Sequence, residues 1–522
     1  MTTEQIKQLE KELWDAADAL RANSKLTAAE YKDPLLGLVF LRFAQNLYEA
    51  KKIEIEEKLP TGPRGKRALT KEDFLGAGAL MLPQLAQYDY LASLPEAQDI
   101  AEAINNAMRL IEADYPDLQG ILPKNYQEFE KDLLRELVRV FNKDAVKKAT
   151  GDVFGRIYEY FLMKFSMQGA GAQEGGEFFT PPSLVELIVN FIEPSHGVIL
   201  DPACGSGGMF VQTGYFVKSH TDKGVNEAIK CYGMELKTNN AKLAKINLAI
   251  HGIEGKIIET NSFYSDPHNL LGGCDFVMAN PPFNVNKIDK DKDYVKTDPR
   301  LPFGLPKADN GNYLWMQYFH SYLNNTGRAG FVMASSATDA GHSEKLIRQQ
   351  LVETGDVDCI VAVGNNFFYT RSLPCHVWFY DKGKRKENKD KILMIDARNV
   401  YRKVTTTISD FNEEQLEGLT AIIKLYRGEK TTVAKNNEWF NVRFEDGKYK
   451  DIEGLCKIVT LDEVKENDYS LTPGRYVGVT FVEDDGVDYK TRLSEIQLEL
   501  DTLNEEAVTL SKTIANNLKE LI

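Results

Sequence analysis

The chain contains 522 residues, too many for one compact domain, and its 43% of apolar residues is enough for a large core. The formal net charge of −14 argues against a protein that grips DNA unaided, because phosphate binding calls for a basic surface. Either the basic residues cluster locally or a partner supplies much of the grip.

Two further features bound the class of protein. No run of about 18 apolar residues is present to span a membrane, and Met1–Arg21 lacks the apolar stretch of a signal peptide. The six cysteines form no CxxC pair, which argues against a zinc cluster or a disulfide framework. We therefore expect a cytoplasmic protein without a metal site or a membrane partner.

Residues 1–150 are expected to form an all-α N-terminal domain. An apolar residue recurs every three or four positions near the start, which predicts one apolar helix face made of Ile6, Leu9, Leu13, Ala16 and Leu20. A second apolar helix is predicted around Leu35–Leu47, with Pro34 suited to its first turn.

From about residue 195 to 400 short apolar runs alternate with longer amphipathic stretches. Each run has the length of a buried parallel strand; the runs are Val198–Leu200, Lys256–Ile258, Phe276–Ala279, Gly330–Met333, Cys359–Val363, Val377–Tyr380 and Ile392–Ile395. This alternation predicts a doubly wound α/β sheet, which we assign to a catalytic domain over residues 151–430. Such sheets bind ligands at the carboxyl ends of their strands.

One of these runs leads into a glycine-rich turn, Asp201-Pro202-Ala203-Cys204-Gly205-Ser206-Gly207-Gly208. Glycines let the backbone approach a ligand closely, and a strand, a glycine loop and a helix in succession suit NAD, S-adenosylmethionine or a phosphate. The absence of a Gly-Lys-Ser/Thr ending excludes a P-loop. Glu235 ends the next strand-like run, where an acid can accept both ribose hydroxyls; the alternative is a surface acid.

The strand Phe276–Ala279 ends in Asn280-Pro281-Pro282-Phe283. Two prolines stiffen this loop, so that the Asn280 side-chain oxygen and the Pro281 carbonyl form two acceptors aimed at one point. Two acceptors orient an aromatic amine for attack on an electrophile, and Phe283 is placed to stack on the ring that bears it. Chemistry on a base of DNA then requires that the base leave the duplex.

Between Phe283 and Asp309 lies a long segment with five basic residues: Lys287, Lys290, Lys292, Lys296 and Arg300. Four aspartates are interleaved with them, so a solvated loop and a DNA-contacting loop both remain open.

The last region, residues 431–522, ends in a predicted helix over about 489–522. Its apolar residues alternate at spacings of three and four, as in a coiled-coil seam: Leu493, Ile496, Leu500, Leu503, Ala507, Leu510 and Ile514. Either this seam folds back on its own domain or it binds another protein.

The turn at Asp201–Gly208 and the later Asn280–Phe283 resemble the motifs of amino-group DNA methyltransferases. A third element, Gly176-Glu177-Phe178-Phe179-Thr180-Pro181-Pro182, precedes both, and this order is similar to the γ arrangement of adenine-N6 enzymes. With the helical N-terminal region, the segment Asn467–Val477 and the C-terminal helix, the resemblance narrows to the modification subunit of type I restriction-modification systems and covers nearly the whole chain.

This resemblance implies S-adenosylmethionine as the cofactor. It implies cofactor contacts at Glu177, Phe178, Phe179, Thr180, Pro181, Pro182, Asp201, Gly205, Ser206, Gly207, Glu235 and Asn261, and chemistry at Asn280, Pro281, Pro282 and Phe283. Glu177 stands where many relatives have Gln, and Asn261 where many have Asp. The implied partners are DNA, a specificity subunit on which the C-terminal helix docks, a second copy of this chain and, in the full complex, a restriction subunit.

Three alternative functions are compatible with part of the sequence and have to be weighed. Pro374-Cys375 is the nucleophile dipeptide of cytosine-C5 methyltransferases, but Cys375 begins an apolar strand and is expected to be a buried structural residue. Enzymes that methylate a glutamine of release factors also carry Asn-Pro-Pro and an aromatic, but they lack so long a helical N-terminal region. A scaffold that binds the cofactor without turnover would not need Asn280.

Overall fold

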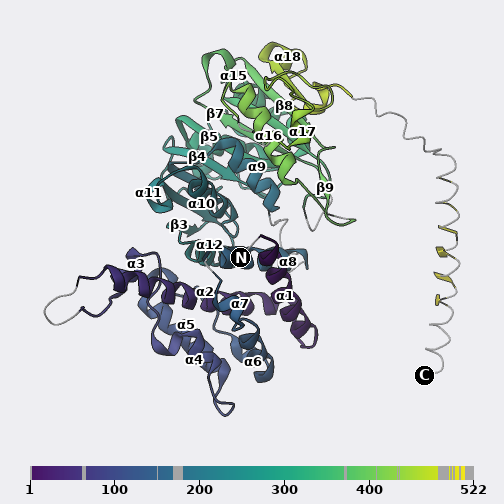
Figure 1. Ribbon diagram of the computed structural model, residues 1–522. Helices are drawn as coiled ribbons and strands as arrows, with labels where there is room; N and C mark the ends of the chain where they lie inside the picture. Colours follow the sequence, from purple (N-terminus) through teal and green to yellow (C-terminus); the bar gives the residue numbers. More distant parts are fainter. Residues whose placement is uncertain are drawn as a thin grey trace. The chain divides into compact units, whose positions relative to one another are not determined.

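The computed structural model describes residues 3–60, 66–149, 151–168, 180–307, 309–368, 373–406, 408–431, 433, 435–479 and part of 493–511. The chain divides into two units, Met1–Val477 and Gly478–Ile522 (Figure 1). In the described part of the chain, no helix is both long and apolar enough to cross a bilayer.

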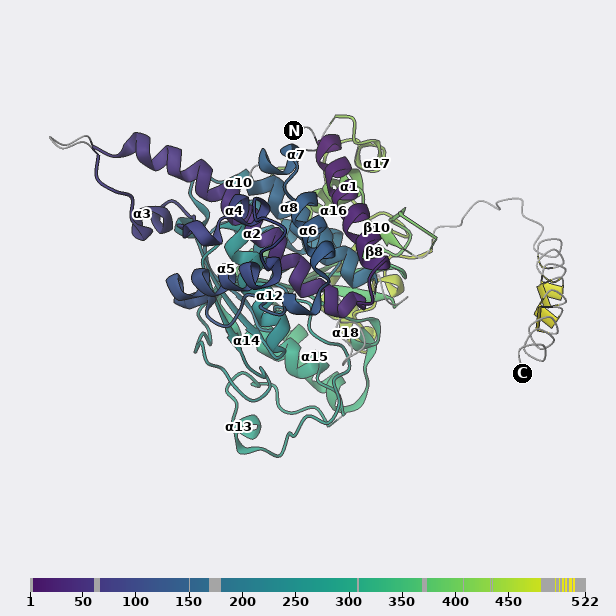
Figure 2. The same cartoon turned by 90° about the horizontal axis from the view of Figure 1, so that it is seen from below.

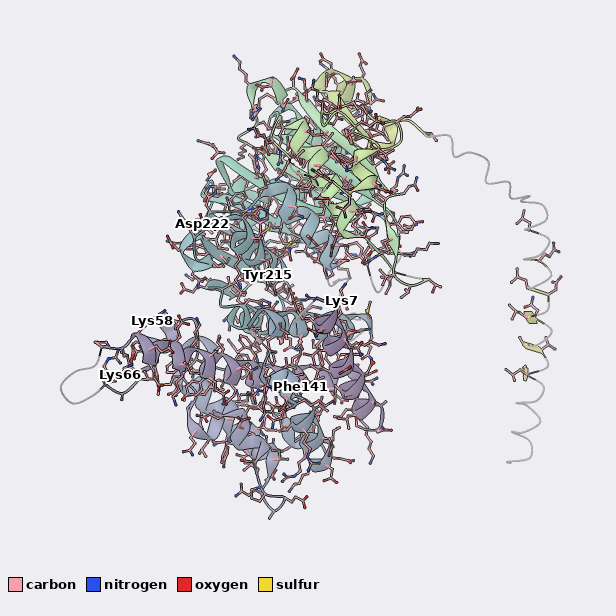
Figure 3. All side chains as sticks on the ribbon, viewed as in Figure 1. Lys7, Lys58, Lys66, Phe141, Tyr215 and Asp222 are labelled. Atoms are coloured by element: carbon pink, nitrogen blue, oxygen red, sulfur yellow. The ribbon has the colours of Figure 1, made fainter. Side chains whose placement is uncertain are left out.

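The first part of unit one is helical. Its helices are α1 (Thr3–Ala22), α2 (Ala28–Lys58), α3 (Lys71–Gly76), α4 (Tyr88–Ala92), α5 (Ile100–Asp114), α6 (Lys131–Val140), α7 (Asp144–Lys147) and α8 (Gly151–Met167). Short 3₁₀ turns lie between them: η1 (Gln84–Ala86), η2 (Pro116–Leu118) and η3 (Tyr126–Glu128). The predicted face of α1 is buried at Ile6, Leu9 and Leu13, which confirms that helix. Figure 3 places Phe141, fully buried, among these helices.

The start of α2 differs from the prediction. The helix begins at Ala28 rather than at Pro34, and Pro34 lies inside it. Thr27 caps the helix: its hydroxyl accepts the N–H of Glu30, and the Glu30 carboxylate accepts the N–H of Thr27. This reciprocal pair satisfies two donors at the helix start, and Pro34 leaves one hydrogen bond unmade in the following turn.

A nine-stranded sheet forms the second part of unit one, in the order β11-β8-β6-β7-β5-β4-β1-β2-β3. Its strands are β1 (Gly197–Asp201), β2 (Ile229–Glu235), β3 (Gly255–Glu259), β4 (Cys274–Ala279), β5 (Leu323–Ala334), β6 (Val357–Val363), β7 (Cys375–Asp381), β8 (Lys391–Ala397) and β11 (Cys456–Thr460). Every predicted run lies in a strand. β11 was not predicted from the sequence. A separate two-stranded ribbon pairs β9 (Arg402–Lys403) with β10 (Ser409–Asp410).

Strands β1 to β5 pair in parallel, as does β6 with β8. The expectation of parallel strands is wrong for β7, which is antiparallel to both β5 and β6. The physical reason is the connection: β6 ends at Val363 and β7 begins at Cys375, and the described part of this connection contains no crossover helix, so β7 returns beside β6 in the opposite direction. β11 is also antiparallel, to β8.

Helices cover both faces of the sheet. Alternate residues of β4 separate to the two sides, with Phe276 and Met278 in one apolar cluster and Val277 and Ala279 in the other. The first face carries α9 (Pro182–Ile192), α10 (Gly208–His220), α12 (Thr238–His251) and α16 (Glu413–Tyr426); the second carries α14 (Asn312–Tyr322), α15 (His342–Glu353) and α18 (Leu461–Glu466). The doubly wound α/β architecture is therefore confirmed.

Shorter elements complete unit one: α11 (Val225–Ala228), α13 (Asp293–Lys296), α17 (Glu438–Asn441), η4 (Ser335–Asp339), η5 (Lys386–Asn388) and η6 (Pro473–Arg475). Figure 2 draws the segment that carries α13 at the periphery.

One helix joins the helical part to the sheet. α12 contributes Leu243, Ile246 and Ile250 to the apolar core of the helical part, where they meet residues of α8 and α2. Its Ala241, Ala244 and Leu248 belong to the core of the sheet. α8 packs in the helical core, although the sequence analysis began the catalytic domain at residue 151. The two predicted domain boundaries, after residues 150 and 430, stay predictions.

Candidate active site

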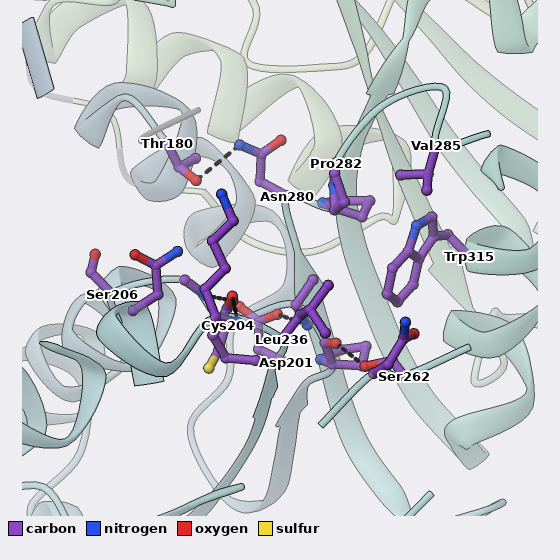
Figure 4. A pocket seen from close by; sticks show the side chains of 18 of the residues that line it. Thr180, Asp201, Cys204, Ser206, Leu236, Ser262, Asn280, Pro282, Val285 and Trp315 are labelled. Atoms are coloured by element: carbon purple, nitrogen blue, oxygen red, sulfur yellow. Dashed lines mark hydrogen bonds between the residues drawn. The ribbon is translucent and has the colours of Figure 1, made fainter. Parts of the chain in front are cut away.

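A cavity of about 410 Å³ opens at the carboxyl ends of β1, β2 and β4 (Figure 4). β1 lies between β4 and β2, so the connections from β1 and from β4 leave the sheet on opposite sides of this point. A doubly wound sheet opens a crevice for a ligand at such a switch point. The glycine turn, Glu235 and the Asn280 loop all reach this one cavity.

The glycine turn wraps the end of β1 and leads into α10. Gly205 has a φ of 53°, and a Cβ added to it would meet no atom within 4 Å, so its free face looks into open space. The N–H of Gly205 donates to the Glu235 carboxylate at 2.9 Å, and the N–H of Cys204 donates to the carbonyl of Met234 at 3.0 Å. These bonds tie the turn to the end of β2.

Two acids lie at the floor of the cavity. Glu235 is 7% exposed, and its second oxygen accepts the N–H of Lys237 at 2.9 Å. Asp201 is fully buried and accepts the N–H of Ala203 at 3.0 Å. Burial raises the pKa of Asp201 to about 8, partly offset by the Ala203 N–H, and the nearby Glu235 charge adds to the rise. Glu235 therefore lies where it can both hold the glycine turn and accept hydrogen bonds from the hydroxyl groups of a bound ligand.

The chain after β3 forms another wall. Asn261 accepts the N–H of Phe263 on its side-chain oxygen at 3.0 Å, and the Ser262 hydroxyl donates to the carbonyl of Pro202 at 2.6 Å. Both residues line the cavity, and the cofactor contact expected of Asn261 stays a prediction. Because Ser262 is bonded to the chain beside the glycine turn, these two walls form one unit.

Asn280 follows the last residue of β4, and the two polar atoms of its side-chain amide have different surroundings. Its Nδ2 donates to the Thr180 hydroxyl at 3.0 Å, drawn as a dashed line in Figure 4. Its Oδ1 is buried, and no described residue donates a hydrogen bond to it. An acceptor without a partner in a buried position is costly, since the oxygen has lost its water and gained nothing. Thr180 thus orients the amide so that the free acceptor is presented to a donor in the cavity.

The predicted site residues divide into three groups. The cavity is lined by Thr180, Asp201, Gly205, Ser206, Glu235, Asn261, Asn280, Pro281 and Pro282. Beside it, not on its wall, lie Pro181, Pro182, Gly207 and Phe283; Pro182 opens α9, Gly207 has a φ of 80° at the start of α10, and Phe283 meets Phe368 edge to face. The last group, Glu177, Phe178 and Phe179, lies outside the described residues.

The structure adds residues that sequence reasoning missed. Lys32 of α2 and Leu162 and Phe165 of α8 line the cavity from the helical part, and Trp315 of α14 lines its far end. No local pattern marks these residues, because each lies in an ordinary amphipathic helix. Their proximity comes from packing between segments far apart in the chain.

One basic residue of the 284–308 segment is excluded as a DNA contact. Arg300 is 1% exposed and forms an ion pair with Asp298 at 2.6 Å. It also donates to the carbonyl of Ser262 at 3.0 Å and lies 4.1 Å from the centre of the Tyr318 ring. Arg300 is therefore an anchor that fastens this segment to the cavity wall. Cys375 is fully buried in β7, as predicted, and burial raises the pKa of its thiol to about 12.

Two protein-family models match this chain. Residues 149–485 match the family described as N-6 DNA Methylase, and residues 9–141 match the HsdM N-terminal domain. The chain is 34% identical to the type I restriction enzyme MjaIX methylase subunit of Methanocaldococcus jannaschii, over 99% of this chain and 91% of that protein. It is 32% identical to the HindI methylase subunit of Haemophilus influenzae, over 80% of this chain and 92% of that protein.

This chain belongs to the methylase subunits of type I restriction enzymes. Among solved structures, the methyltransferase subunit of a type I system from Streptococcus thermophilus has the same fold, with a TM-score of 0.71 and 20% identity, over 90% of this chain and 99% of that one. A chain from a structure on complex assembly and conformational transition of the type I system gives a TM-score of 0.56 at 19% identity, over 97% and 98%.

As a type I methylase subunit, the chain is a methyltransferase that acts on DNA. Membership also answers the release-factor alternative, because the matches extend over the helical N-terminal region. The non-enzymatic scaffold is likewise disfavoured, since the Asn280 loop is intact and presents a buried acceptor.

Proposed function

We propose that this chain transfers the methyl group of S-adenosylmethionine to N6 of adenine in DNA, and that it depends on a specificity subunit to choose the target. The observation that carries the proposal is the buried Oδ1 of Asn280 at the carboxyl end of β4, to which no residue in the described part of the chain donates a hydrogen bond. An exocyclic amine is a donor of matching chemistry, and adenine must leave the duplex to bring it there.

The cavity residues fit this cofactor. Gly205 leaves open space beside the backbone, and Glu235 offers a carboxylate for ribose hydroxyls. The sulfonium of S-adenosylmethionine supplies an electrophilic methyl group, so the protein forms no covalent intermediate. The Asn280 side-chain oxygen and the Pro281 carbonyl accept hydrogen bonds from the two amine hydrogens. This geometry rotates the nitrogen lone pair out of conjugation with the ring, so that it can attack the methyl group. Catalysis rests on positioning and electrostatics.

Partners follow from the same proposal. The chain carries a net charge of −14, so a specificity subunit is expected to provide sequence recognition and much of the DNA grip. We expect two copies of this chain on each specificity subunit, with a restriction subunit joining the full complex. In unit two, the described seam residues are exposed, Leu500 by 55%, Leu503 by 53% and Leu510 by 63%, which suits a surface that a partner covers.

The direct test is methyl transfer by the purified complex. This chain and its specificity subunit are incubated with tritiated S-adenosylmethionine and DNA, and incorporation of the label is measured. In a second experiment, single-molecule sequencing of DNA from cells with and without the chain locates the methylated positions. N6-methyladenine at one sequence is the expected product. Methylation of cytosine, or of a protein, would contradict the proposal.

A prediction on the glycine turn follows. Gly205→Val should weaken S-adenosylmethionine binding at least about tenfold, because the branched side chain occupies the open space into which the glycine looks. Isothermal titration calorimetry measures the affinity, and a melting curve measures folding.

The matched control is Gly252→Val. Gly252 ends α12 with a φ of 63° and has the same open space around an added Cβ, but it does not line the cavity. Both variants carry the strain of a left-handed backbone, so both should melt lower. Equal cofactor affinity in the two variants would remove the glycine turn from the site.

A further inference from the structure

A side chain that lines the far end of the cavity carries a buried hydrogen-bond donor that the proposed chemistry does not use. Among the described residues, only two that line the cavity have a buried side-chain N or O atom without a hydrogen-bond partner. One is Asn280, an acceptor. The other is Trp315, whose indole Nε1 can only donate.

Trp315 is held firmly. The residue is 3% exposed, lies in α14, and its ring packs 4.6 Å from that of Phe263 and 5.9 Å from that of Phe319. Buried tryptophans normally find an acceptor for the indole N–H, since an unpaired donor has lost its water without gaining a partner. A side chain fixed in this way lines the cavity and holds its buried N–H at one place beside it.

The position of Trp315 indicates which of the two proposed ligands it contacts, the cofactor or the target base. Figure 4 draws Thr180 and Asn280 at one end of the cavity and Ser262 and Trp315 at the other. Phe263, which Trp315 contacts, is bonded to Asn261 after β3. The apolar side chains of Phe263, Val285 and Ile288 line the cavity together with Trp315, a lining that suits a flat heterocycle.

We propose that the Trp315 indole N–H donates a hydrogen bond to an acceptor nitrogen of the cofactor's adenine ring. This inference rests on the proposed use of S-adenosylmethionine. It makes Trp315 a specificity-determining residue: the cavity reads the heterocycle by a buried donor, and a ligand without the matching acceptor leaves that donor unpaired.

The test uses binding rather than turnover. S-adenosylhomocysteine and three analogues, in which N1, N3 or N7 is replaced by C–H, are titrated into the full chain by calorimetry. The wild-type protein should bind one of the three about tenfold more weakly than the parent compound. Trp315→Phe should bind the parent about tenfold more weakly and should no longer distinguish it from that analogue.

Trp378→Phe is the matched control. Trp378 is fully buried in β7 with an unpartnered Nε1, but it does not line the cavity, so its loss should lower the melting temperature and leave the analogue series unchanged. No discrimination by the wild-type protein, or full discrimination by Trp315→Phe, overturns the inference and leaves the proposed function standing. No binding of S-adenosylhomocysteine to the wild-type protein overturns both.

Discussion

Asn280→Ala is expected to reduce methyl transfer by at least about 100- to 1000-fold while cofactor affinity changes little. The side-chain oxygen is the buried acceptor that awaits the amine, and its loss removes an interaction made as the nitrogen attacks. Incorporation of tritiated methyl groups measures the rate, and calorimetry measures cofactor binding. Substantial residual methylation would contradict the role of Asn280.

Two variants make this result specific. Thr180→Val removes the hydroxyl that accepts Asn280 Nδ2, so the amide loses its orientation but not its acceptor, and we expect a smaller fall in rate of about tenfold. Asn388→Ala is the control for removing a buried amide: Asn388 donates to the carbonyl of Tyr426 at 3.2 Å, and neither residue lines the cavity. It should lose stability and methylate DNA normally.

Truncation after Lys490 is expected to abolish both co-purification with the specificity subunit and methylation of the target site. The retained part includes the whole of unit one, which contains the sheet, the apolar cluster on each face of the sheet, and the cavity. The truncated chain should therefore fold and bind the cofactor. Gel filtration and calorimetry separate the two properties. A truncated chain that still forms the full complex would show that the helix is not the docking element.

Single substitutions sharpen this prediction. Leu503→Asp puts a charge in the seam, where an exposed leucine is expected to be covered by the partner, and should disrupt the complex. Val508→Asp adds the same charge at a residue that is 55% exposed but lies off the seam, and should leave the complex intact. Equal effects of the two variants would contradict a specific seam. Ile496 and Ile514 lie outside the described residues.

Lys32 is one of the residues through which the helical part lines the candidate active site. Together with Leu162 and Phe165 it lines the cavity that Asn280 faces. The Lys32 ammonium lies 3.5 Å from the carboxylate of Asp33, so its charge is held at this wall. The helical part therefore closes one side of the candidate active site in addition to packing on α12.

Much of the site was readable from the sequence because its parts are local. A strand followed at once by Gly205-Ser206-Gly207, and another followed by Asn280-Pro281, each carry a chemical meaning within a few residues. Their convergence was also predictable, since the carboxyl ends of strands near a switch point share one edge of a sheet. The antiparallel direction of β7 was not predicted, because an apolar run looks the same in either direction.

By itself the sequence determined the type of sheet, the order of the three motifs and the family, since these depend on short patterns and on overall similarity. Only the tertiary structure decided that Thr180 occupies Asn280 Nδ2 while no described residue donates to Oδ1, that Arg300 is buried, and that the Trp315 side chain lines the cavity while its N–H meets no described acceptor. The physical reason is that a hydrogen bond is either made or missing according to which distant groups packing brings within about 3 Å, and no local pattern carries that information.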